Sequence, residues 1–121
     1  MEHAVEAYSQ SAKISKSPQE LEATLLLKAA SQLQAIKDEW NESSGQLDTV
    51  LHYNRQLWTV FVSSVHSSEN QLPLEIKNNI ASLGAFIFQH SLAVLSDPKP
   101  EKLTPLININ REIAAGLHST A

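Results

Sequence analysis

The chain has 121 residues, no cysteine and a formal net charge of −4. This length accommodates a single hydrophobic core, so we expect one domain over residues 1–121. Without cysteine, disulfides, thiolate nucleophiles and Cys-ligated metals are excluded. The nine Lys and Arg residues are scattered along an acidic chain. Such a distribution does not form a phosphate-binding surface, and direct binding of nucleic acid is not expected.

Membrane and export signals are also not expected. The first residues lack the basic stretch and the long apolar stretch of a signal peptide. No window reaches the roughly 18 apolar residues that a helix needs to span a bilayer. We therefore expect neither a signal peptide nor a membrane-spanning segment.

The first predicted elements lie on either side of a helix-start signal. Residues 3–13 are weakly amphipathic and predict a short N-terminal helix. Ser17 can cap a helix, Pro18 suits the first helical position, and Glu20 stands where a capping box places its carboxylate. The first long helix should run from there to about Glu42 and stop at Gly45 in a left-handed conformation. Its predicted inward side chains are Leu26, Ala30, Leu33, Ile36 and Trp40.

The second long helix is predicted over about residues 46–66, where apolar residues recur at a spacing of three and four. The members of this stripe are Leu47, Val50, Leu51, Leu57, Trp58, Phe61, Val62 and Val65. Asn54 occupies a slot in the stripe where another apolar residue is expected. A buried amide without a partner costs about 1–3 kcal/mol, so Asn54 must be satisfied internally or be kept for a binding partner.

Two further helices complete the predicted fold, over about residues 73–95 and from residue 102 or 104 to 117. Their apolar stripes are Ile76, Ile80, Leu83, Ile87, Val94 and Leu95, and Leu106, Ile109, Ile113 and Leu117. An interior glycine weakens a helix, so Gly84 predicts close packing against a neighbour. Three Gly and five Pro are too few for a β-sandwich, and short connections favour antiparallel neighbours. We predict an all-α fold: a compact antiparallel bundle of about four main helices plus the short N-terminal helix.

The fourth helix offers Asn54 an internal partner. Asn110 lies next to the inward face of that helix, so the two amides could pair across the helices and fix their register. Trp58 fits the core, because large aromatic side chains at helical spacing usually pack inside. We assign structural roles to Asn54, Trp58, Asn110 and Gly84. Separation of the two amides by more than one water would exclude the pairing.

No pattern of catalytic or metal-binding residues stands out. No two of the five histidines lie three or four apart on one predicted helix, so none of these helices presents a pair of His ligands. A nucleophile elbow and a phosphate-binding glycine loop are both absent, and Asp38 and Glu39 fit a solvated helix surface. We expect no enzyme activity, no cofactor and no metal. A metal site assembled from different helices is the alternative left open.

The candidate contacts for a protein partner are Tyr, Arg and apolar side chains outside the predicted core. Tyr and Arg are enriched among residues that dominate protein interfaces. Tyr53 and Arg55 flank the apolar stripe of the second helix, Val5 and Tyr8 lie in the N-terminal segment, and Arg111 lies in the fourth helix. An apolar groove between helices, uncovered by the N-terminal segment, would receive an amphipathic helix.

Several segments, in the same order along the chain, resemble the FlaF family of flagellar proteins. They are Glu-Leu-Glu-Ala-Thr-Leu-Leu-Leu-Lys-Ala-Ala at 20–30, Tyr-Asn-Arg-Gln-Leu-Trp at 53–58, Asn-Gln-Leu-Pro-Leu-Glu-Ile at 70–76, and Leu-Ile-Asn-Ile-Asn-Arg-Glu-Ile-Ala-Ala-Gly-Leu at 106–117. The Asn-x-x-Leu-Trp element at 54–58 and the Ile-Asn-Arg…Gly-Leu ending at 109–117 are the most specific. Neither is a catalytic signature, so the resemblance indicates a family and not a reaction.

The resemblance implies a cytoplasmic protein of flagellated alphaproteobacteria that is required for flagellin production and filament assembly. It also implies association with flagellin and post-transcriptional regulation of flagellin synthesis together with FlbT, a regulator of flagellin mRNA. We therefore expect a flagellin-binding chaperone and regulator that binds a terminal amphipathic helix of flagellin and contacts neither nucleic acid nor membrane. The alternative is a regulatory adaptor that acts through FlbT without stable flagellin binding.

Overall fold

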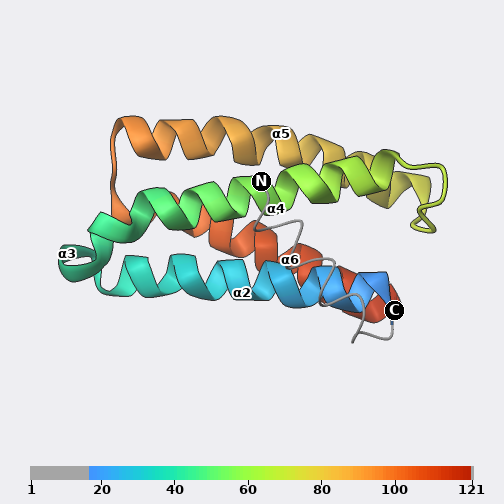
Figure 1. Ribbon diagram of the computed structural model, residues 1–121, viewed down its shortest axis with the longest axis horizontal. Helices are drawn as coiled ribbons and strands as arrows, with labels where there is room; N and C mark the ends of the chain where they lie inside the picture. The colour runs from blue at the N-terminus through green and yellow to red at the C-terminus, as the bar shows by residue number, and fades with distance from the viewer. Residues whose placement is uncertain (1–16, 121) are drawn as a thin grey trace.

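The computed structural model describes residues 17–120, except for the side chain of residue 120, and these residues form helices joined by short connections (Figure 1). The long helices are α2 (Pro18–Asp38), α4 (Leu47–His66), α5 (Leu74–Ser96) and α6 (Thr104–Thr120). The shorter elements are α3 (Trp40–Ser43) and the 3-10 helices η1 (Ser44–Gln46) and η2 (Pro100–Leu103). This part of the chain contains no strand, which confirms the all-α prediction. The predicted helix over 3–13, with Val5 and Tyr8, lies outside the described residues.

Local signals in the sequence determine where α2 and α5 begin. Ser17 Oγ accepts a hydrogen bond from the Glu20 backbone N–H at 3.1 Å, and Pro18 occupies the first turn of α2. Pro73 precedes α5 in an extended conformation, because its ring suits the start of a helix and not its interior. The starts of α2, α4, α5 and α6 thus agree with the prediction to within a residue.

The predicted end of the first long helix is wrong. Glu39 leaves helical geometry, with φ −120° and ψ 48°, so α2 ends at Asp38 and not near Glu42. The chain continues through α3 and η1, where Ser43 Oγ donates to the Glu39 carbonyl at 2.7 Å. Gly45 lies inside η1, and no glycine in residues 17–120 has a positive φ. A local 3-10 turn, and not a left-handed glycine, therefore redirects the chain.

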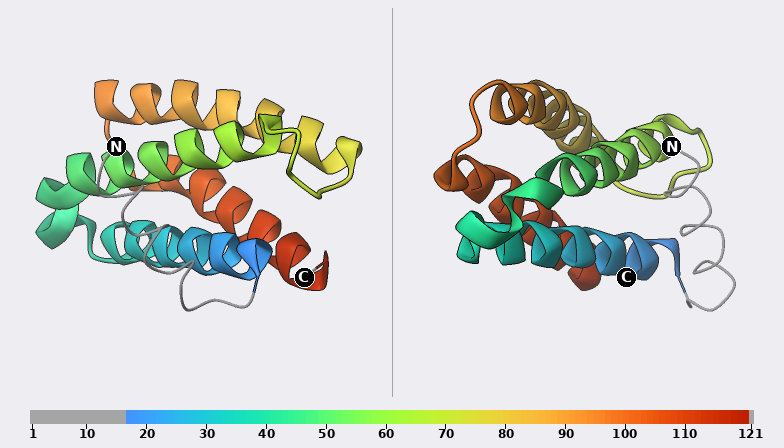
Figure 2. Two further views of the ribbon diagram at one scale, coloured as in Figure 1. Left: turned by 45° about the vertical axis from the view of Figure 1, so that its right-hand side comes forward. Right: turned by 60° about the vertical axis from the view of Figure 1, so that its left-hand side comes forward.

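Successive long helices run in opposite directions, as Figure 1 shows. α6 packs most extensively against α2, and α4 lies between α2 and α5 (Figures 1 and 2). The main contact of α5 is with α4 alone. The fold is therefore a three-helix unit of α2, α4 and α6 with α5 packed on one side of α4.

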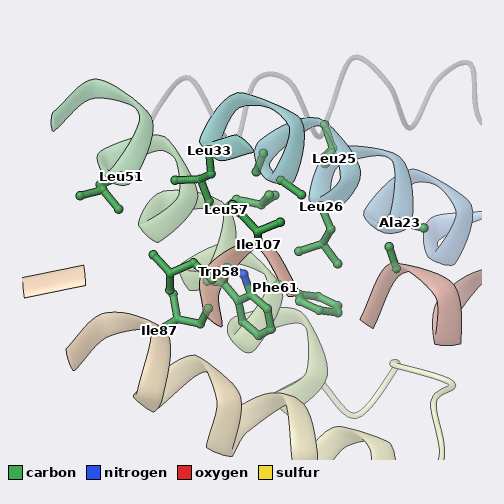
Figure 3. Close-up of a cluster of buried hydrophobic side chains, with 14 of the residues drawn as sticks. Ala23, Leu25, Leu26, Leu33, Leu51, Leu57, Trp58, Phe61, Ile87 and Ile107 are labelled. Atoms are coloured by element: carbon green, nitrogen blue, oxygen red, sulfur yellow. The ribbon is translucent and has the colours of Figure 1, made fainter. Parts of the chain in front are cut away.

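The core is formed by apolar side chains from all four long helices (Figure 3). Trp58 is fully buried at its centre and meets Phe61 edge to face, with ring centroids 5.4 Å apart. The predicted inward residues of the first long helix are buried except Trp40, which belongs to α3 and is half-buried beside the core. Half-buried members of the predicted stripes that pack against this core are Val50, Val62, Ile76, Leu83, Leu95, Ile109 and Ile113.

Candidate functional site

Three fully buried polar side chains join α4 to α6. Asn110 Nδ2 donates to Asn54 Oδ1 at 2.8 Å, and Trp58 Nε1 donates to Asn110 Oδ1 at 2.9 Å. All three residues have 0% of their surface exposed. The predicted pairing of Asn54 with Asn110 is confirmed, and Trp58 is an additional member of this polar junction. Asn54 Nδ2 is the one amide donor of the junction without a hydrogen-bond partner.

Gly84 brings α5 close to α4. A Cβ atom at this position would lie 2.5 Å from Val62 Cγ2 and 3.7 Å from Trp58 Cε3. Carbon atoms do not approach to 2.5 Å without displacement, so a larger residue would push the two helices apart. The prediction of close packing at Gly84 is confirmed. The polar junction holds α4 against α6, and this contact at Gly84 holds α4 against α5.

α5 leaves much of its apolar surface exposed. Its 23 residues include a window of mean hydropathy 1.3, enough by length and composition to cross a membrane. The sequence prediction is that no window contains about 18 apolar residues, and α5 does not contain one, because Asn, Ser, Gln and His side chains interrupt it; its mean hydropathy is nevertheless high enough to meet this criterion. Core helices of water-soluble proteins meet the same criterion, but only 28% of this window is buried. The large apolar side chains that α5 leaves exposed are Leu74, Phe86 and Leu92.

One edge of α5 carries a second apolar stripe, distinct from its buried stripe. Ala81, Ala85, Phe88 and Leu92 recur at intervals of four, three and four, which places them on one side of a helix. We call these four residues the docking stripe. Ala85 and Leu92 are exposed, Leu92 to 57%, and the other two are half-buried. Leu92 is the one large side chain of the stripe that is exposed, and Phe88 packs against the core beside it.

A hollow of about 420 Å³ separates the docking stripe from α4. It is lined by His52, Arg55, Gln56, Thr59, Phe88 and Leu92. Arg55 is half-buried, and its Nε–H group is buried without a hydrogen-bond partner. Unpartnered buried donors carry a desolvation penalty that an incoming acceptor would relieve. The hollow therefore combines apolar walls with one cationic donor.

A second hollow of about 330 Å³ adjoins the first across α4, between α4 and α2. Its lining is Lys28, Gln32, Thr49, Val50, His52, Tyr53 and Gln56, so His52 and Gln56 border both hollows. The Tyr53 hydroxyl is buried without a hydrogen-bond partner, and burial raises the pKa of this group. Lys28 Nζ lies 5.9 Å from the centre of the Tyr53 ring, within the range of a cation–π contact. The structure thus brings the predicted residues Tyr53 and Arg55 to one face of the molecule.

Other residues of this face were not predicted, and one predicted residue lies elsewhere. Arg111 is exposed on α6 and lines neither hollow. Phe88 and Leu92 do not belong to the stripe that predicts the buried face of this helix, so the prediction did not include them. The spacing of the docking stripe was the signal that could have revealed them. Lys28 has no comparable signal in the sequence, because only the packing of α2 on α4 brings it beside Tyr53.

Metal-binding geometry is not found among residues 17–120, where no group of three or more His, Cys, Asp and Glu could hold an ion. The chemistry that this face offers is the burial of apolar side chains together with hydrogen bonds from Arg55 and Tyr53.

The chain matches the model of a known protein family. No curated protein and no solved structure matches the chain. The family model described as flagellar protein FlaF matches residues 4–117. That range includes the polar junction, Gly84 and the whole docking stripe. Because the match covers nearly the whole sequence, this chain belongs to the FlaF family of flagellar proteins.

Proposed function

We propose that this FlaF protein is a cytoplasmic chaperone that binds flagellin and regulates its synthesis and secretion after transcription. In this proposal it is a binding protein and not an enzyme. A terminal amphipathic helix of flagellin lies along the docking stripe, with its apolar face on Phe88 and Leu92. The observation that carries the proposal is this exposed apolar stripe beside the hollow that contains Arg55.

The composition of α5 supports an apolar partner surface. Residues 78–96 contain no Asp, Glu, Lys or Arg, so the outer part of this helix has no charge to solvate it. An amphipathic helix seated on such a surface uses anchors at a spacing of three and four, which the docking stripe matches. Burial of one leucine side chain contributes about 1.5–3 kcal/mol, so few anchors are needed for micromolar affinity.

Arg55 gives the partner helix a preferred orientation. Within residues 17–120, its buried Nε–H group has no acceptor, and no acidic residue lines the hollow. A carboxylate at the edge of the apolar face of the partner would form a charge-assisted hydrogen bond with the guanidinium group. We therefore expect the bound flagellin segment to place an Asp or Glu beside its apolar anchors.

The test is calorimetric titration of the full chain with flagellin, comparing Leu92→Ser with Leu27→Ser. Both leucines are exposed, but Leu27 lies on α2 outside the stripe. We expect Leu92→Ser to weaken binding about tenfold or more and Leu27→Ser to leave it unchanged. Equal affinities would contradict the docking stripe as the binding surface. Binding to an FlbT-type regulator without any binding to flagellin would instead favour the adaptor role.

A further inference from the structure

A polar hollow lies at the other end of α4, away from the docking stripe. It has a volume of about 270 Å³ and opens between the start of α2 and the segment that joins α4 to α5. The residues around it are Pro18, Gln19, Glu22, Ser64, Ser67, Glu69, Asn70 and Gln71. Of the described residues around the hollow, two are acids and none is a lysine or arginine.

Glu22 is the unusual member of this group. Only 4% of its surface is exposed, and its Oε2 atom is buried without a hydrogen-bond partner. The same side chain borders a small cavity whose other walls are Leu26, Leu57, Val60 and Phe61. Burial against these apolar walls raises the pKa of the Glu22 carboxyl to about 7. Among the described residues, none supplies Oε2 with the cation or donor that buried acids normally have.

The segment opposite Glu22 is held in place by its own hydrogen bonds. Asn70 Nδ2 donates to Ser64 Oγ at 3.3 Å, and Asn70 Oδ1 accepts from the Leu72 backbone N–H at 2.9 Å. Leu72 is buried, which anchors the segment to the core. The hollow therefore has defined walls on both sides, with Glu69 exposed at its rim.

We propose that this hollow binds the cationic side chain of a lysine or arginine from a protein partner, with Glu22 as the buried counter-ion and Glu69 as a second acceptor. A guanidinium or ammonium group supplies the donors that the Glu22 carboxylate lacks. The amide and hydroxyl oxygens around the hollow accept its remaining hydrogen bonds. The site is independent of the docking stripe and does not require that the partner be flagellin.

The test is a titration of the full-length protein with N-acetyl-argininamide, followed by NMR of the labelled Glu side chains. N-acetyl-citrullinamide serves as the neutral ligand of the same shape. We expect the arginine compound to lower the pKa of Glu22 from its value near 7, because a bound cation favours the carboxylate. The citrulline compound should leave that pKa unchanged. A response to both ligands, or to neither, would overturn the proposal.

Substitutions distinguish specific contributions of Glu22 and Glu69 to binding from an effect of the overall charge of the protein. Glu22→Gln should weaken binding of the arginine compound about tenfold, Glu69→Gln should weaken it less, and the exposed control Glu112→Gln should have no effect. Thermal unfolding of each variant verifies that the fold is intact. An equal loss of affinity in all three variants would mean that only the net charge of the protein matters, and it would overturn the proposed site.

Two further outcomes concern the source of the cation. If replacing both Lys13 and Lys16 by Gln raises the pKa of Glu22 in the free protein, the chain supplies the cation itself, and the assignment to a partner fails. If calcium displaces the arginine compound at equal or lower concentration, the hollow is a metal site and the assignment also fails. If neither occurs, the partner assignment is supported.

Discussion

α5 and α6 both carry many apolar side chains, but they differ in how much of this apolar surface is buried. α6 lies against α2 and is hydrogen-bonded to α4, and its Leu106, Ile107 and Leu117 are buried. α5 rests mainly on α4 and leaves Leu92 and Leu74 exposed to 57% and 72%. Apolar surface stabilises a fold only where it is removed from water. The comparison indicates that α2, α4 and α6 carry the stability, whereas α5 leaves apolar surface exposed, where we propose that a partner binds.

The two helices also differ in how they contact α4. α6 uses the polar junction, in which Asn110 bonds both Asn54 and Trp58. α5 uses close packing at Gly84 against Val62. Buried hydrogen bonds specify one register, because misplacement leaves polar groups without partners. We therefore expect the contact between α4 and α6 to be the more sensitive to substitution.

The largest effect on stability should come from Asn110→Ala. This change leaves Trp58 Nε1 and Asn54 Oδ1 without partners in a site with no solvent access, and should destabilise the protein by about 3–5 kcal/mol. Urea denaturation measures the change in the free energy of unfolding. Asn108→Ala, at an exposed position of the same helix, is the control. A loss below about 1 kcal/mol would mean that the junction contributes little.

Glu22→Gln tests a buried carboxyl of the three-helix unit whose Oε2 atom has no hydrogen-bond partner. Burial raises the pKa of Glu22 from 4.5 to about 7, so the folded state binds a proton more tightly than the unfolded state. Ionisation of Glu22 should therefore destabilise the wild type progressively as pH rises from 4.5 to 7, reaching on the order of 3 kcal/mol above pH 7. Glu22→Gln should be more stable than wild type at pH 8 and similar at pH 4. Parallel pH profiles for the two proteins would contradict the burial of this carboxyl.

Gly84→Ala tests the closeness of α5 to α4. Alanine favours helix formation, but its Cβ would meet Val62 Cγ2, so we expect a net loss of about 1–2 kcal/mol. Adding Val62→Ala should recover part of this loss. Gly116→Ala is the matched control, because nothing lies within 4 Å of its Cβ position. That control should stabilise α6 by up to about 1 kcal/mol. Equal effects at the two glycines would argue against close packing.

Leu92→Ser should have the smallest effect on stability. The side chain is 57% exposed, and substitutions at such positions usually change the free energy of unfolding by about 0.5 kcal/mol or less. Ile107→Ser, at a buried position of α6, should cost several times more. Thermal unfolding of the two variants compares them directly. A similar loss in both would mean that α5 is as much a part of the core as α6.

The sequence predicted those features that depend on local chemistry or on a single repeated spacing. Ser17 and Pro18 marked the start of α2 because capping and proline geometry are properties of adjacent residues. Asn54 is a polar break in an apolar stripe, and Asn110 on the predicted fourth helix is the partner that the sequence offers it. Gly84 was identified because an interior glycine needs a packing reason.

Features that depend on how helices meet were not predicted. The hydrogen bond from Trp58 to Asn110 requires the crossing of α4 and α6, which no spacing in the sequence specifies. The turn at Glu39 and Ser43 depends on hydrogen bonds to Ile36 and Glu39 carbonyls, so Gly45 was a misleading stop signal. The burial of Glu22 was likewise invisible, because it depends on the walls that α4 supplies.

Amide hydrogen exchange of the full chain, with and without flagellin, tests the central claim most directly. In the free protein, α5 should exchange faster than α6, because fewer of its side chains are buried. Added flagellin should slow exchange in α5 and in the part of α4 around Arg55, while α6 remains unchanged. Protection that appears on the outer side of α6 around Arg111, or nowhere, would contradict the assignment of α5 as the docking surface.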